Sequence, residues 1–205
     1  LTDYSDPIGS VVREITSNCF DAHEKAGVDR DVIVRMNRDS QLEGGTAQIQ
    51  FEDFGVGLTP DDVEEIFTVV GESTKREGNQ EIGAFGIGAK SPFGYIRHND
   101  LGGYIVDTYV DGTHWKYFLA EDAESGPQMT EMLCEDTDRT NGTIVTVPIA
   151  DGHFYKFKRA IKKELAYFEN IDFQVDGIDN DYTIYRGENF VYRPNSPYDK
   201  LHACF

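Results

Sequence analysis

The sequence predicts an α+β fold, with helices on one face of a mixed, mainly antiparallel sheet. Two strand-like segments, at 31–36 and 47–53, follow a long amphipathic helix. More strand-like segments lie between 103 and 149, after a glycine-rich stretch that leads into another helix. This order of elements is typical of helices that share one layer over a sheet.

The first helix has clear start and stop signals. Ser5 or Asp6 can accept hydrogen bonds from the first free amides, and Pro7 suits the first helical position. Apolar residues then recur at helical spacing until Gly27, which ends the helix. The residues with this spacing are Ile8, Val11, Val12, Ile15, Cys19, Ala22 and Ala26.

Polar segments separate the elements in the middle of the chain. Thr59 and Pro60 predict the start of a short helix, which runs out at Gly71. The stretch 71–82 is polar and aperiodic, so it is expected to be a mobile loop.

Three strands are expected after the glycine-rich stretch. Asp-Gly and Asn-Gly pairs, which favour tight hairpin turns, connect the strand-like segments there. The acidic segment 121–142 is expected to be irregular. The expected strands are 103–110, 114–120 and 143–149, and the expected turns are Asp111-Gly112 and Asn141-Gly142.

A change of composition and charge near residue 150 is the expected domain boundary. Residues 1–150 would form the first domain, and 151–205 would begin a second domain. The chain begins almost directly with a helix and stops in an apolar, strand-like segment, so both ends are expected to be cuts in a longer protein. The second part is expected to contain a basic helix, 154–168, and short strands at 171–175, 182–186 and 189–192.

The composition of the 205-residue chain limits the classes of function. It is 39% hydrophobic with thirteen Phe and eleven Tyr, which is enough for a packed core. No apolar run reaches the roughly 18–20 residues that a membrane span needs. The formal net charge of −18 argues against a nucleic-acid surface, because phosphate backbones need clustered Lys and Arg.

The three cysteines, Cys19, Cys134 and Cys204, are few, odd in number and far apart. This usage suits a reducing compartment such as the cytoplasm, and it favours neither a disulfide framework nor a zinc site. Cys19 is expected to be a core thiol. His23 and His153 have no neighbours at metal-ligand spacing and are expected at the surface.

Three polar residues border the apolar face of the first helix. At about 100° per residue, Glu14, Asn18 and Asp21 fall within about 60° of one another. They form either a solvated edge of the helix or a functional cluster of acidic and amide side chains. The helix by itself favours the solvated edge.

A second candidate is DFGVG, residues 53–57, directly after a strand-like segment. It is either a glycine turn at a strand end or a carboxylate, Asp53, fixed beside a flat ligand. In the second case Gly55 and Gly57 would let that ligand approach the backbone. A carboxylate accepts hydrogen bonds, so its natural partner is a donor such as the exocyclic amine of adenine.

The third candidate is EIGAFGIGAKSPFGY, in which Gly83, Gly86 and Gly88 precede Lys90. Amides at a helix N-terminus attract anions, and a lysine adds a point charge. A simple turn is the alternative, because the stretch follows no strand and lacks the spacing of a Walker A loop. The pattern alone leaves phosphate binding open.

The order of these motifs along the chain is more specific than any one of them. The chain resembles the GHKL ATPase superfamily, with its Bergerat fold, in the succession REITSNCFDAH, DFGVG, a polar loop, GAFGIGAKS and NGTIVTV. This superfamily includes gyrase B, MutL, heat-shock chaperones and histidine kinases. Over residues 1 to about 150, VVREITSNCFDAH and GAFGIGAKSPFGY look most like the rapid-lysis A (rIIA-like) proteins of lytic bacteriophages.

The resemblance implies an ATPase that uses Mg²⁺, with a role for each matching residue. Glu14 matches the glutamate that polarises the attacking water, and Asn18 matches the amide ligand of Mg²⁺. Asp53 matches the aspartate that reads adenine. Asp21 matches a position close to the nucleotide, Thr143 a hydroxyl near the adenine, and Gly55 and Gly57 the glycines beside the purine. The phosphate loop is matched by Gly83, Gly86 and Gly88, followed by Lys90. A lid that can reach the phosphates is matched by Ser73, Thr74 and Lys75.

The implied function is Mg²⁺-dependent ATP binding and hydrolysis, with the lid at 71–82 closing over the nucleotide. Two alternatives stay open: a histidine-kinase-like catalytic domain, and a nucleotide switch or interaction protein with little hydrolysis. Histidine kinases usually carry a basic residue in place of Asp21, which favours the ATPase.

The resemblance leaves the partners of the protein open. Several relatives supply a catalytic lysine from a second, transducer-like domain, and no residue of this chain can be matched to it. Hydrolysis by this chain alone therefore stays open. So do a homodimer, a phage or host protein partner and a peripheral contact with the inner membrane, while the implied location is the cytoplasm of an infected bacterium.

Overall fold

The structure is a computed structural model that describes residues 6–38, 47–65, 90–122, 126–166, 168–176 and 178, together with three short segments at 185–187, 190–192 and 202–203. Its main element is a seven-stranded sheet. In chain order its strands are β1 (Val32–Asn37), β2 (Gln48–Glu52), β3 (Gly103–Val110), β4 (Thr113–Asp122), β5 (Gly126–Asp136), β6 (Gly142–Pro148) and β7 (Ile171–Gln174). Across the sheet their order is β5-β4-β3-β6-β2-β1-β7.

Antiparallel pairing dominates this sheet. Among its described strand pairs only β1 and β7 run parallel. The hairpin between β3 and β4 turns at Asp111 and Gly112, which have φ angles of 52° and 80°. Two successive positive φ angles are what a tight two-residue hairpin turn requires. The prediction of a mixed, mainly antiparallel sheet is confirmed.

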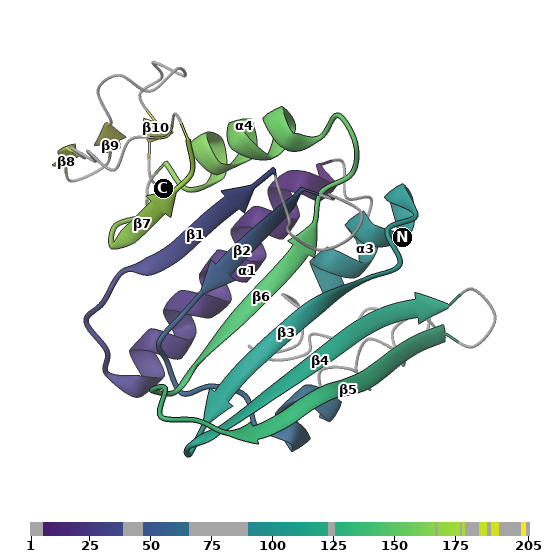
Figure 1. The fold of residues 1–205 in the computed structure, drawn as a ribbon. Coiled ribbons are helices and arrows are strands. Elements are labelled where there is room, and N and C mark those ends of the chain that lie inside the picture. The colour runs from purple at the N-terminus through teal and green to yellow at the C-terminus, as the bar shows by residue number, and fades with distance from the viewer. Residues whose placement is uncertain are drawn as a thin grey trace, which may run out of the picture.

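A layer of helices covers one face of the sheet. It contains α1 (Pro7–Ala26), α3 (Lys90–Asn99) and α4 (Phe154–Glu164). Figure 1 shows α1 behind β1, β2 and β6, and α1 packs against both α3 and α4. The predicted ends of α1 are confirmed, because the Asp6 side chain accepts a hydrogen bond from the Gly9 amide at 2.9 Å and the left-handed Gly27 ends the helix.

A helical turn at 60–65 begins where Thr59 and Pro60 predict it. The Thr59 hydroxyl accepts a hydrogen bond from the Asp62 amide at 3.2 Å, and the Asp62 carboxylate accepts one from the Thr59 amide at 2.8 Å. This reciprocal pairing is a capping box. The turn places Val63 in the core, at 2% exposure.

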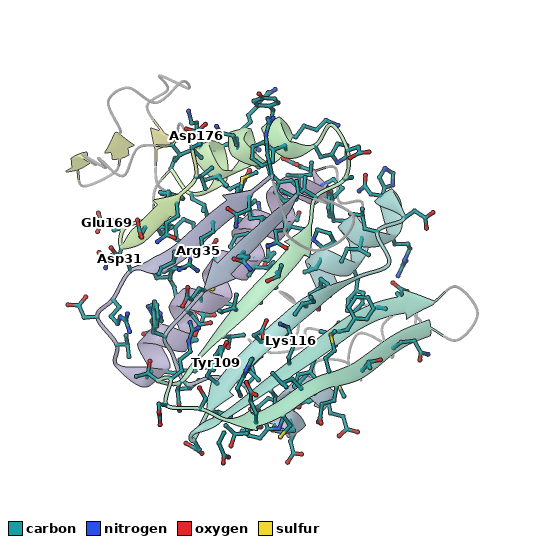
Figure 2. All side chains as sticks on the ribbon, viewed as in Figure 1. Asp31, Arg35, Tyr109, Lys116, Glu169 and Asp176 are labelled. Carbon is teal, nitrogen blue, oxygen red and sulfur yellow. The ribbon has the colours of Figure 1, made fainter. Side chains whose placement is uncertain are left out.

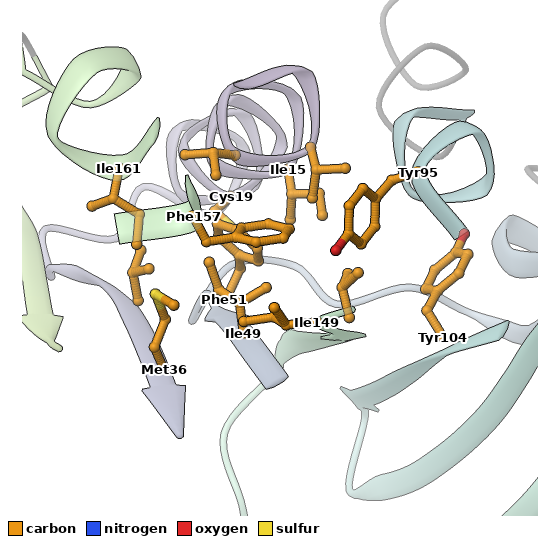
Figure 3. Packing of buried hydrophobic residues seen from close by; sticks show 14 of the residues in the cluster. Ile15, Cys19, Met36, Ile49, Phe51, Tyr95, Tyr104, Ile149, Phe157 and Ile161 are labelled. Atoms are coloured by element: carbon orange, nitrogen blue, oxygen red, sulfur yellow. The ribbon is translucent and has the colours of Figure 1, made fainter. Parts of the chain in front are cut away.

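The hydrophobic core lies between the helical layer and the sheet (Figure 3). Val32 and Val34 in β1, like Ile49 and Phe51 in β2, are completely buried. They alternate with outward-facing residues because successive side chains of a strand point to opposite faces. Cys19 of α1 is 3% exposed, which confirms the predicted core thiol.

Helix α4 and strand β7 belong to this same core, although both lie beyond the domain boundary expected near residue 150. Phe157, Ile161 and Phe173 are buried in the cluster that also contains the apolar face of α1. The change of charge near 150 reflects only the exposed, basic side of α4, whose apolar side packs on α1. The boundary at 150 therefore does not separate these elements.

Strand β5 occupies much of the segment that was expected to be irregular. That expectation was wrong for residues 126–136, which pair with β4 from end to end except at an irregularity at Met132. β5 is an edge strand with several exposed acidic residues, so its sequence lacks the alternation that marks a half-buried strand. The partner strand supplies the backbone hydrogen bonds that stabilise it.

The last part of the chain contains a small antiparallel sheet in the order β10-β9-β8. Its strands are β8 (Tyr185–Gly187), β9 (Phe190–Tyr192) and β10 (His202–Ala203), of which the first two overlap predicted strands. That this part of the chain belongs to the second domain expected over 151–205 stays a prediction. Within the described parts of the chain, every helix is too short or too polar to cross a membrane.

The shared core gives a test of the position of α4. Phe157→Ala should lower the free energy of unfolding by about 3–5 kcal/mol, the usual cost of emptying a buried phenylalanine site. Trp115, the single tryptophan, lies in β4, so its fluorescence during denaturation reports on a distant part of the sheet. Tyr155→Ala is the matched control, because Tyr155 is 70% exposed on the same helix.

The two outcomes are distinct. If α4 shares the core, Phe157→Ala shifts the Trp115 transition and the control moves it by less than about 0.5 kcal/mol. A Trp115 transition that Phe157→Ala leaves in place would show that α4 unfolds as part of a separate unit.

Candidate functional site

A cavity lies between α1 and the sheet, where the loop after β2 passes under the helix. Its volume is about 100 Å³, several times the roughly 10–15 Å³ that one water molecule needs. Aliphatic side chains from α1, from the loop and from β3, β4 and β6 form most of its wall. The side chains with polar oxygen or nitrogen atoms that line it are Asn18, Asp53, Tyr104 and Thr143.

Asp53 is a buried carboxylate at the end of β2, with 5% of its surface exposed. Its Oδ1 accepts a hydrogen bond from the Gly55 amide at 2.9 Å. Burial raises the pKa of Asp53 to about 7, while the amides of Gly55 and Thr143 partly offset this rise. The site therefore holds a hydrogen-bonding oxygen at the wall of an apolar cavity.

The loop that carries Asp53 is held by three consecutive backbone amides. The Asp53 amide donates to the Thr143 carbonyl at 2.9 Å, which joins the loop to β6. The Phe54 amide donates to Nε2 of His23 at 2.8 Å, which joins it to α1. The Gly55 amide donates to Asp53 itself. Every donor of this short segment is therefore paired, as buried backbone requires.

The glycines of the loop are needed for packing against protein. A Cβ on Gly55 would lie 2.5 Å from the backbone of Ala22 in α1. Gly57 has a φ of 75°, and a Cβ there would collide with the Tyr109 carbonyl. The interpretation from sequence is that these glycines let a ligand approach the backbone. The structure shows that they let the loop lie directly against α1 and β3, and that Gly57 also lines the cavity.

Thr143 follows Gly142 at the start of β6 and faces the cavity, with 6% of its surface exposed. Gly142 has a φ of 151°, and a Cβ on it would overlap the Asp53 carbonyl. The Asn141-Gly142 pair that predicted a turn is thus also the point where β6 meets the end of β2.

The polar stripe on α1 divides into two parts. Asn18 lines the cavity, whereas Glu14 and Asp21 are not among its lining residues. The Glu14 carboxylate pairs with Arg13 at 3.1 Å, and Arg13 also reaches Glu164 of α4 at 3.2 Å. Asp21 is exposed. The structure therefore brings together Asn18, Asp53, Gly57 and Thr143, and leaves the other two carboxylates outside the wall of the cavity.

Several predicted site residues lie outside the described part of the chain. Lys90 is the first residue of α3, and its side chain is not described. The predicted site residues that the structure does not describe at all are Ser73, Thr74, Lys75, Gly83, Gly86 and Gly88.

His23 is a functional candidate that the sequence pattern misplaces at the surface. It is 4% exposed in the last turn of α1, beside the loop that carries Asp53. A helical projection gives the signal that could have found it, because His23 lies four residues after the buried Cys19 and borders the apolar stripe. His153 is partly buried, and its Nδ1 lies 3.2 Å from the Tyr95 hydroxyl.

The opposite face of the sheet carries charged side chains, among them Arg35 of β1 (Figure 2). Glu52 is 5% exposed and pairs with Arg35 of β1 and with Arg139, between β5 and β6. Arg139 lowers the pKa of Asp53 and Glu52 raises it, both by less than burial does. Because the partners come from distant parts of the chain, no local sequence signal predicts this cluster.

Comparison with known proteins decides the family. Residues 4–130 match the family described as histidine kinase-, DNA gyrase B- and HSP90-like ATPase, which covers more than half of the chain. The chain belongs to this ATPase family. The sheet with helices on one face is the Bergerat fold of these ATPases, and the cavity beside Asn18 and Asp53 lies mostly within the matched residues.

Part of the chain is also similar to the B subunit of type 2 DNA topoisomerase 6 from Pyrobaculum aerophilum. The two chains are 32% identical over 79 residues, which is 38% of this chain and 15% of the topoisomerase chain. The chain thus spans a small part of that relative's length. The similarity supports the ATPase family and does not extend to the whole of that relative.

The raised pKa of Asp53 makes a prediction about stability. The folded protein keeps the Asp53 proton up to about pH 7, whereas the unfolded chain loses it near pH 4, so burial of Asp53 destabilises the fold increasingly as pH rises between these values. Asp53→Asn removes this charge. Relative to wild type, it should therefore gain about 2 kcal/mol between pH 5 and pH 8.

Denaturant unfolding at several pH values would measure this difference. Asp29→Asn is the control, because Asp29 is exposed and carries no buried charge. A constant gap between wild type and Asp53→Asn across this pH range would contradict the buried, protonatable carboxylate.

Proposed function

We propose that the chain is a Mg²⁺-dependent ATP-binding and ATP-hydrolysing module, in which Asp53 reads the adenine. One observation carries the proposal: a buried carboxylate at the wall of an apolar cavity, held in orientation by a hydrogen bond from the Gly55 amide to its Oδ1. Membership of the ATPase family supports it.

The cavity fits a purine base by its chemistry. Ligand sites are mostly apolar and contain a few placed polar groups that fix orientation. Leu58, Val106 and Leu119 offer such walls, and Asp53 offers an acceptor for the exocyclic amine of adenine. Guanine has a carbonyl at that position, so the same carboxylate would disfavour it.

The residues beside the cavity also fit a metal-bound triphosphate. Asn18 would give Mg²⁺ a neutral oxygen, since this ion usually takes few protein ligands and completes its shell with phosphate and water. When bound, the ion supplies charge stabilisation at the phosphates. Glu14 lies one helical turn before Asn18, and we assign it the ordering of a water molecule.

The phosphate-binding and lid roles rest on sequence alone. We assign the phosphate loop to Gly83, Gly86, Gly88 and Lys90, and the lid to 71–82, because their order matches the family motifs. Asp21 is assigned a place near the nucleotide on the same ground. Lid closure and nucleotide-driven dimerisation are parts of this proposal.

A nucleotide switch with little hydrolysis is the second candidate. The observation that favours it is the pairing of Glu14 with Arg13, outside the cavity wall. For hydrolysis Glu14 must exchange Arg13 for water. Turnover measurements on the full-length protein distinguish the two candidates.

The biological setting is also proposed. The motifs quoted above favour a rapid-lysis A protein of a bacteriophage, acting in the host cytoplasm with a phage or host protein partner and a peripheral membrane contact. The topoisomerase relative acts on DNA by its name, but a formal net charge of −18 does not favour nucleic acid as a partner of this chain.

Adenine selectivity should depend on Asp53. In Asp53→Asn the side-chain oxygen can still accept from the Gly55 amide, which leaves the amino group to face the cavity as a donor. ATP affinity should fall by about 2 kcal/mol, or roughly 30-fold, and the preference for ATP over inosine triphosphate should shrink. Calorimetric titration of both nucleotides measures this, and unchanged ATP binding would refute the assignment.

Glu14 should matter for hydrolysis and not for binding. Glu14→Gln should bind Mg-ATP within a few-fold of wild type but hydrolyse it at least about 100-fold more slowly, as loss of a general base does. Phosphate release by the full-length protein measures this. Glu24→Gln, an exposed carboxylate change on the same helix, is the control. Normal turnover in Glu14→Gln would place the base elsewhere.

A further inference from the structure

We propose that His23 is a positioning residue for adenine recognition, which holds the Asp53–Phe54 peptide so that the Asp53 carboxylate faces the cavity. The proposal rests on the adenine site proposed above. His23 is assigned no contact with the nucleotide, because it acts through the Phe54 amide.

The peptide between Asp53 and Phe54 is held at both of its ends. A peptide unit is planar, so the Asp53 carbonyl and the Phe54 N–H move together. Nε2 of His23 accepts from the N–H at 2.8 Å. On the other side the Asp53 carbonyl lies against Gly142, where even a Cβ would not fit. Rotation of this plane would change the ψ angle of Asp53, so the backbone beside the Cα that carries the adenine-reading carboxylate would have to readjust.

His23 is suited to be an acceptor. It is 4% exposed, and burial lowers its pKa, which favours the neutral ring. A hydrogen bond with the Arg30 backbone shifts the pKa upward, as an acceptor for a ring N–H does. One ring nitrogen then donates to Arg30, and Nε2 is left to accept from Phe54.

No other described contact of Phe54 can replace this acceptor. The Arg30 guanidinium lies over the Phe54 ring, 3.5 Å from its centre. A guanidinium has only donors, so it cannot pair with an amide N–H. Loss of the His23 acceptor would leave the Phe54 amide to find a new partner, which turns the peptide plane.

Two substitutions separate the hydrogen bond from the packing. His23→Leu fills a similar volume without an acceptor. His23→Gln places an amide oxygen close to the position of Nε2 and keeps the acceptor. Each variant would be titrated with Mg²⁺ and either ATP or inosine triphosphate, and its unfolding midpoint would be recorded. In nucleotide-free protein, the amide proton shift and exchange rate of Phe54 would be measured by NMR.

We expect His23→Leu to bind ATP at least 10-fold more weakly, with a smaller preference for ATP over inosine triphosphate and faster exchange of the Phe54 amide. His23→Gln should stay within about threefold of wild type in all three measurements. Equal loss of both nucleotides in both variants would indicate general damage and overturn the proposal. So would an unchanged ATP preference in a folded His23→Leu protein.

The NMR measurement keeps this proposal distinct from the function on which it rests. If wild-type protein binds no ATP, the proposed function fails, and adenine positioning fails with it. If the Phe54 amide proton then exchanges slowly in wild-type protein and faster in His23→Leu, the hydrogen bond is present and purely structural. If wild-type protein binds ATP and the Phe54 amide does not respond to His23→Leu, only the His23 proposal is overturned.

Discussion

A single buried carboxylate sets the requirements for the rest of the site. Asp53 ends β2 at the wall of an apolar cavity, where an ionised oxygen has little solvent around it. A group in that position must be held in one orientation and must have its neighbouring amides paired, or the loop would turn toward water. The bonds from Thr143 of β6, His23 of α1 and Gly55 meet this requirement from three directions.

Helix α1 connects the parts of the site because it spans the sheet next to the cavity. Its middle presents Asn18 to the cavity, and its last turn supports the Asp53 loop through His23. Its first turns contact α4, where Arg13 links Glu14 to Glu164. The helix that carries both the proposed metal ligand and the proposed base is therefore in direct contact with α4.

The sequence by itself determined many of the elements and indicated the family. Capping residues and apolar spacing fixed α1, and turn pairs fixed the hairpin of β3 and β4, because these signals act between residues close in the chain. The order of the motifs identified the ATPase family, and three polar cavity residues, Asn18, Asp53 and Thr143, were named from sequence.

Tertiary structure alone decided what lies beside these residues. The strand β5 forms although its own pattern is weak, since β4 pairs with it, and α4 joins the first core because its apolar side finds α1. The glycines at 55 and 57 are required by the backbones of Ala22 and Tyr109. His23 and the Glu52–Arg139 pair escaped prediction for the same reason: their partners are distant in sequence, and only the folded chain brings them into contact.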